Sequence, residues 1–123
     1  EETGARITRC GSMAEARARV ADGVFSMALT GLNLPDAPNG EILDFLLENE
    51  IATIVFTAPT FYRQMAALAG SYDLGSLRAS VSAGEALPDA TRTLWRRASG
   101  LEMIDGIGGT EMIHVFISAA GSD

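Results

Sequence analysis

Apolar residues along the chain fall into short runs that are typical of β-strands. The clearest is 51–57, IATIVFT, in which β-branched and apolar residues follow one another without regular polar alternation. Such a run is typical of a strand that is buried on both faces of a parallel sheet. The other β-prone runs, which we predict as further strands, are 5–10, 24–30, 77–82, 101–105 and 114–118.

Between these runs, apolar residues recur at helical spacing and the chain carries helix start and stop signals. Ser12 and Glu15 have the spacing of a capping box, and Pro59 and Pro88 stand where first turns would begin. Gly23 and Gly100 are placed to end helices. The helices predicted on these grounds are 12–21, 41–49, 59–68 and 88–98.

Strands and helices therefore alternate, which is typical of an α/β domain with a mostly parallel sheet. We predict one domain over residues 1–123, with a three-layer, doubly wound, flavodoxin-like architecture. The connection between the last two predicted strands is too short for a helical crossover of about a dozen residues. An antiparallel last strand at the sheet edge is therefore the alternative for 114–118.

Polar segments follow four of the predicted strands. They are TGLNLPD (30–36), TAPT (57–60), SAGEAL (82–87) and DGIGGTE (105–111). The carboxyl ends of parallel strands share one edge of a sheet, and ligands of such sheets bind there. The pattern thus predicts a candidate site at that edge.

Charge and composition narrow the classes of partner. The net charge is −7, and all nine basic residues are arginine, since the chain contains no lysine. This balance argues against binding to nucleic acid or to an anionic membrane surface. The single cysteine, Cys10, allows no internal disulfide and suits a reducing compartment, so we expect a cytoplasmic protein without a membrane-spanning segment.

Residues 3–58 resemble a response-regulator receiver domain in the order strand, helix, strand, LNLPDAPNGE loop, helix, and strand ending in FTA. In that family the loop is preceded by an aspartate that accepts phosphate. The resemblance places Gly31 at this position and Thr57 at the position of a switch hydroxyl. Asp36 is a nearby alternative acceptor. A receiver-like module that binds a partner without phosphorylation is one functional hypothesis.

Residues 51–121 resemble the adenylate-forming aryl-CoA ligases that act on benzoate or 2-aminobenzoate. The resemblance rests on TIVFTAPTFYRQMAAL, DLGSLRASVSAGEALP and RRASGLEMIDGIGGTEMIHVFIS. It implies an adenine and ribose site along Ser82, Ala83, Gly84 and Glu85. It also implies that Asp105 and Gly106 flank the adenine, that Thr110 contacts the phosphate and that Glu111 holds magnesium. The implied walls of an aromatic-acid pocket are Phe61, Tyr62, Gly108, His114 and Val115.

The two resemblances share the strand at 51–57, so the sequence is interpreted as a chimera of a receiver-like half (1–57) and a ligase-like half (58–123). Phosphoryl chemistry needs cations, and no lysine is present. We therefore expect no catalytic residue, no complete active site and no cofactor, with Mg²⁺ and AMP or ATP bound only if a ligase-type site persists. The alternative is an aryl-CoA ligase fragment with residual adenylate binding. Self-association is a further expectation, from apolar surface that the two halves leave exposed.

Overall fold

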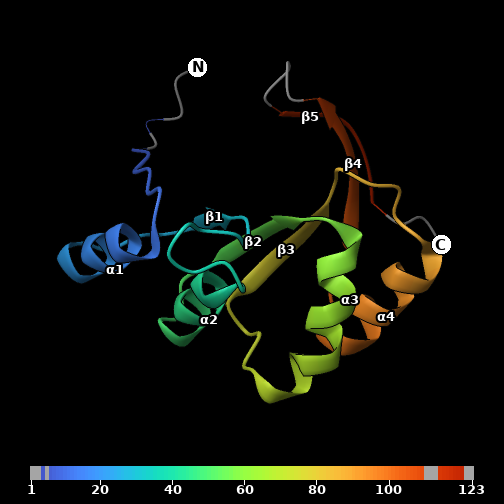
Figure 1. The fold of residues 1–123 in the computed structure, drawn as a ribbon, viewed down its shortest axis with the longest axis horizontal. Coiled ribbons are helices and arrows are strands. Elements are labelled where there is room, and N and C mark those ends of the chain that lie inside the picture. Colours follow the sequence, from blue (N-terminus) through green and yellow to red (C-terminus); the bar gives the residue numbers. More distant parts are fainter. Residues whose placement is uncertain (1–3, 5, 110–113, 121–123) are drawn as a thin grey trace.

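The computed structural model describes residue 4, residues 6–109 and residues 114–120, and side chains up to residue 106. Helices and strands alternate through these ranges (Figure 1). In chain order they are α1 (Met13–Asp22), β1 (Ala28–Thr30), α2 (Glu41–Glu48), β2 (Thr53–Thr57), α3 (Pro59–Leu68), the 3-10 turn η1 (Ala69–Ser71), β3 (Leu77–Ser82), α4 (Asp89–Ser99), β4 (Met103–Gly109) and β5 (His114–Ala120).

The strands form one sheet in the order β1-β2-β3-β4-β5. Strands β1 to β4 are parallel, and β5 pairs antiparallel with β4. This confirms the α/β class, the mostly parallel sheet and the antiparallel alternative for the last strand. The predicted strand at 51–57 appears as β2, which lies between β1 and β3.

The doubly wound, three-layer prediction is wrong for the described residues. A doubly wound sheet reverses its winding direction at one point, whereas here each parallel strand is added beside the one before it. Because parallel crossovers are right-handed, a sequential order places every crossover helix on the same face. Helices α2, α3 and α4 accordingly lie together on one face of the sheet (Figure 1).

Side-chain burial along the strands also shows that only one face of the sheet is covered by helices. Val55 in β2 and Met103 in β4 face the helices and are fully buried. Leu29 in β1 and Phe56 in β2 point to the other face and are 73% and 39% exposed. The described residues therefore form two layers, and one apolar face of the sheet is open.

Several predicted strands differ from the observed elements, and the predicted strand 24–30 is limited to the three residues of β1. Residues 6–10 form no strand, and Ile7 is 82% exposed, because no neighbouring strand pairs with this segment. The predicted strand 101–105 instead continues as β4 to Gly109, paired with β5 from Ile104 onward. Residues 105–109 of the glycine-rich segment are thus strand rather than loop.

Helix ends follow the predicted signals closely. The Ser12 hydroxyl accepts a hydrogen bond from the Glu15 amide at 3.1 Å, and the Glu15 carboxylate accepts one from the Gly11 amide at 2.6 Å. Pro59 opens α3. Gly100 adopts φ +75°, the left-handed conformation that closes α4.

The main core joins α3 and α4 to the centre of the sheet through Tyr62 and Trp95. Both side chains are buried, and their rings pack edge-on with centroids 5.1 Å apart. The Tyr62 hydroxyl lies 2.9 Å from the carbonyl oxygen of Val55 and 3.0 Å from that of Val81, and Trp95 Nε1 donates to Ser80 Oγ at 2.9 Å. Burial raises the pKa of the Tyr62 hydroxyl, so it stays a neutral donor.

Helix α1 belongs to a second cluster, with Met13 packed near Ile42 and Phe45 of α2. Asp36, in the loop after β1, fixes the start of α1 because its carboxylate accepts from the amides of Met13 at 2.7 Å and Ala14 at 3.0 Å. These amide hydrogen bonds hold the pKa of Asp36 below its usual range. The contact is electrostatically favourable because a helix N-terminus attracts negative charge.

We predict that Tyr62→Phe lowers the free energy of unfolding by about 1–3 kcal/mol, because it removes a buried donor from two carbonyl groups. Tyr72→Phe is the matched control, since Tyr72 is exposed and its change is expected to stay within about 0.5 kcal/mol. Urea unfolding measures both. Equal stabilities of the two variants would contradict the role assigned to Tyr62.

We predict that α1 loosens as the pH falls below the ordinary aspartate pKa of about 3.9. A carboxylate whose pKa is depressed on folding stabilises the fold above the unfolded pKa, and that contribution is lost as the pH falls through the folded pKa. Hydrogen exchange of the α1 amides measures this loss. Asp36→Asn should weaken protection of these amides at neutral pH and reduce its pH dependence, whereas Asp73→Asn, in a local turn, should change neither.

Candidate functional site

The carboxyl ends of β1 to β3 bring the polar segments 30–36, 57–60 and 82–87 to one edge of the sheet, as the sequence predicts. Asp105, which begins the fourth segment, lies within β4 and is level with Ser82. The Ala83 amide donates to the Thr57 carbonyl at 3.2 Å, and the Thr60 hydroxyl donates to the Glu85 carboxylate at 3.3 Å. These contacts join the segment after β2 to the segment after β3. We call this edge the rim.

The segment Ser82–Glu85 divides into a buried and an exposed part. Ser82 and Ala83 are buried at the end of β3, whereas Gly84 and Glu85 are exposed. Gly84 has φ +89°, and no atom lies within 4 Å of an added Cβ. The positive φ, and not a lack of room for a side chain, is therefore the reason that position 84 favours glycine. The turn exposes peptide groups and the Glu85 carboxylate at the rim.

Asp105 and Gly106 continue the rim within β4. Asp105 pairs with Ser82 in the register between β3 and β4, and its side chain is 35% exposed. Thr110 and Glu111 lie outside the described residues. Their assignment to the phosphate and to magnesium stays a prediction.

Two buried hydroxyl groups lie beneath the rim. Ser82 belongs to the adenine and ribose site that the sequence predicts, whereas Thr91 was not predicted as part of a site. Ser82 Oγ and Thr91 Oγ1, the latter on α4, are buried and have no hydrogen-bond partner among the described residues. Buried polar groups are normally paired. A hydroxyl at a helix position that faces the sheet, such as Thr91, is the sequence signal that could have identified the second group.

The residues predicted to wall an aromatic pocket are placed in three environments. Tyr62 lies in the core, away from solvent. Phe61 lines a cavity of about 230 Å³ between α2 and α3, together with Leu43 and Met65. Gly108 pairs with Val115, and Gly109 with His114, in the β4–β5 ladder, whose side chains are not described. The described residues do not bring Phe61 and Tyr62 to the rim.

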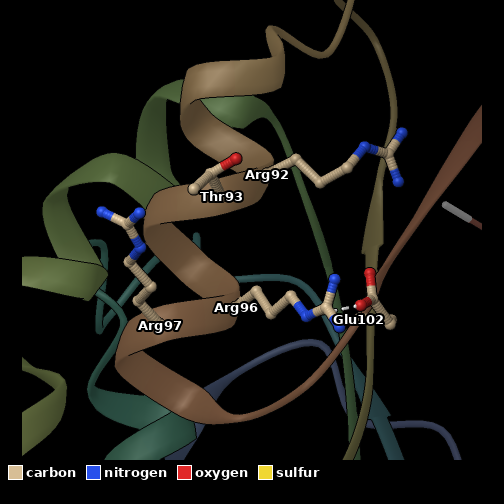
Figure 2. A pocket seen from close by; sticks show the side chains of 5 residues that line it. All are labelled: Arg92, Thr93, Arg96, Arg97 and Glu102. Carbon is tan, nitrogen blue, oxygen red and sulfur yellow. Dashed lines mark ion pairs between the residues drawn. The ribbon is translucent and has the colours of Figure 1, made fainter. Parts of the chain in front are cut away.

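A group of arginines on α4 was also not predicted as part of a site. Arg92, Thr93, Arg96, Arg97 and Glu102 line an open hollow of about 440 Å³ (Figure 2). Arg96 pairs with Glu102 at 2.8 Å. Arg92 and Arg96 extend to the same side of α4, and Arg97 extends to the opposite side (Figure 2).

The residues that carried the receiver resemblance form no acidic cleft. Gly31 follows β1 and is exposed, and Thr57 ends β2. Asp36 is engaged with the start of α1. Among the described residues, no three His, Cys, Asp or Glu side chains are grouped to hold a metal ion, and no helix in these ranges is long and apolar enough to cross a membrane.

Comparison with known proteins gives one continuous family match. The sequence profile of the AMP-binding enzyme family covers residues 23–123. The benzoate–CoA ligase of Thauera aromatica is 34% identical over 104 residues, which are 81% of this chain and 20% of that protein. The anthranilate–CoA ligase of Pseudomonas aeruginosa is 40% identical over 76 residues, which are 59% of this chain and 14% of that protein.

Solved structures agree with the sequence relatives. The anthranilate CoA ligase AuaEII in complex with anthranoyl-AMP matches 76% of this chain and 23% of that chain, with a TM-score of 0.61 and 29% identity. A benzoate CoA ligase from Burkholderia xenovorans LB400 matches 77% of this chain and 24% of that chain, with a TM-score of 0.58 and 25% identity. This chain thus spans about a fifth of the length of the first curated relatives it matches.

These matches correct the interpretation of the sequence as a chimera. The family profile begins at residue 23 and runs through the junction that was placed at residues 57–58. The comparisons give no support to a receiver-like half. The order of strands and helices does not distinguish receivers from ligases, because many alternating α/β families share it. The sequence identity to the ligases, in contrast, extends along most of the chain.

Proposed function

Because this chain belongs to the AMP-binding enzyme family, we propose that it provides the adenylate-binding rim of an enzyme that joins an aromatic carboxylic acid to coenzyme A. The observation that carries the proposal is the rim itself. Segments from β2, β3 and β4 that resemble the ligase motifs are far apart in sequence and lie on adjacent strands. Names of the relatives suggest benzoate or 2-aminobenzoate as the acid class.

In this proposal, the exposed turn at Gly84 and Glu85 lies along the adenosine, and Asp105 and Gly106 flank the base. Backbone amides at such a turn approach a polar ligand closely because glycine carries no side chain. Thr110 contacts the phosphate. Gly108, His114 and Val115 line the aromatic ring from β4 and β5. Tyr62 supports the rim from the core through its contacts with the Val55 and Val81 carbonyl groups, and Phe61 lies away from the ring.

The nucleotide would be AMP or ATP with Mg²⁺. The exposed turn at Gly84, with its φ of +89°, and the partly exposed Asp105 carboxylate fit a bound adenosine. Glu111 would hold the metal ion through oxygen, as Mg²⁺ prefers. When bound, ATP would supply the adenylyl group that activates the carboxylate, with pyrophosphate as the leaving group.

The scarcity of available cationic side chains limits the catalysis that we expect of these 123 residues by themselves. The chain has no lysine, and Arg96 is paired with Glu102. A transferring phosphoryl group needs cationic contacts, each of which can contribute about 10³ in rate or more. We therefore propose adenylate binding without aryl-CoA synthesis for this chain by itself.

We predict that AMP with Mg²⁺ binds saturably in roughly the millimolar range, and that a stable analogue of benzoyl-AMP binds at least about tenfold more tightly because the ring adds apolar contact. Amide chemical shifts, followed at residues 82–85 and 103–109, measure both affinities. Absence of a saturable shift with either ligand would contradict the proposal.

Gly84→Ala should weaken AMP binding several-fold because alanine is strained at φ +89°. Gly70→Ala is the control, since Gly70 has no positive φ and an added Cβ meets no atom within 4 Å. A coupled assay with benzoate, ATP and CoA should give no turnover above buffer for the chain alone. Turnover would show that the cations needed for catalysis are already present.

A further inference from the structure

Arg92 makes the contact that joins α4 to the rim end of β4. Its Nη1 donates to the Met103 carbonyl oxygen at 2.8 Å, and its Nη2 lies 4.0 Å from Asp105 Oδ2. Met103 and Asp105 are two residues apart on one strand, so they lie on the same face of the sheet. One planar guanidinium therefore contacts both the backbone of β4 and the next side chain along that face.

The contact lies just before β4 gains β5 as a second neighbouring strand, while β4 still pairs with β3. Met103 pairs with Ser80 of β3, and the described pairing of β4 with β5 begins one residue later, at Ile104. Arg92 thus donates its hydrogen bond to the carbonyl of Met103, the residue directly before the described pairing with β5. Arg92 and Asp105 are 22% and 35% exposed, so the pair is partly shielded from water but open to a ligand.

Of the three arginines that line the hollow on α4, only Arg92 is placed to contact Asp105. Arg96, one turn along α4, is paired with Glu102, and Arg97 extends to the opposite side of the helix (Figure 2). Asp89, in the first turn of α4, adds negative charge on the same helix. The Arg92 cation beside Asp105 attracts the Asp105 carboxylate and so favours one orientation of that side chain.

We infer that Arg92 is a positioning residue that orients the Asp105 carboxylate to accept a hydrogen bond from the amino group of a bound 6-aminopurine nucleotide. The inference rests on the proposed function, because it assumes that the rim binds adenylate. A carboxylate accepts from an exocyclic amine and gains nothing from a purine that lacks this donor. Arg92 therefore contributes to base selectivity and has no contact with the nucleotide itself.

The test compares AMP with purine riboside 5′-monophosphate, which lacks the 6-amino group, on the 123-residue chain and its variants. The variants are Arg92→Met, Arg92→Lys, Asp105→Asn and the double variant Arg92→Met/Asp105→Asn. Arg96→Met is the matched control, since it removes an arginine from the same helix without touching β4. Circular dichroism establishes that each variant is folded, and amide shifts give the dissociation constants.

We expect the unmodified chain to prefer AMP over the purine analogue by roughly ten- to a hundredfold, the range of one hydrogen bond to a charged group. Arg92→Met should remove most of this preference by weakening AMP binding alone, and Arg92→Lys should restore part of it. In the Asp105→Asn background, Arg92→Met should have no further effect on the preference. Arg96→Met should leave it unchanged.

If Arg92 had only a structural role, Arg92→Met would weaken the binding of AMP and of the purine analogue equally. That result would overturn the inference. An unchanged AMP preference in folded Arg92→Met would overturn it as well. Either result leaves the proposed function standing, because AMP still binds. If the unmodified chain binds neither nucleotide, the proposed function fails, and this inference fails with it.

Discussion

The Tyr62 hydroxyl, held between the carbonyl oxygens of Val55 and Val81, is the contact on which the rim depends. It joins α3 to β2 and β3, and the Trp95–Ser80 hydrogen bond joins α4 to β3. Both contacts lie one or two residues before the strands end. They fix the positions at which Thr57 and Ser82 leave the sheet, so a turn such as Gly84–Glu85 starts from a rigid base.

Much of this arrangement could be predicted from local sequence. The bounds of α3 and β3 are those predicted, since Pro59 and the apolar run at 77–82 are strong local signals. The gathering of polar segments at one edge follows from parallel strands alone. The direction of winding could not be predicted, because strand order depends on contacts between elements that no local pattern records. For the same reason Arg92 went unnoticed, since it contacts residues 11 and 13 positions away.

The receiver resemblance shows how far an element pattern can mislead. Gly31 seemed informative because it replaced an aspartate, yet an added Cβ there would meet only the Phe56 carbonyl at an ordinary 3.6 Å. Neither steric need nor an acidic cleft singles out this position. The ligase resemblance differs in kind, because its three motifs occupy adjacent strands and therefore describe one surface. Spatial convergence of separated motifs is stronger evidence than order along the chain.

The one-sided coverage of the sheet has a thermodynamic consequence. Leu29 and Phe56 leave apolar area in water that a covering surface would remove, and burying one such side chain fully is worth about 1.5–3 kcal/mol. Any molecule that covers this face only in the folded state raises the melting temperature by mass action. A molecule that covers this face would therefore raise the thermal stability of the chain in proportion to the logarithm of its concentration once the face is nearly saturated.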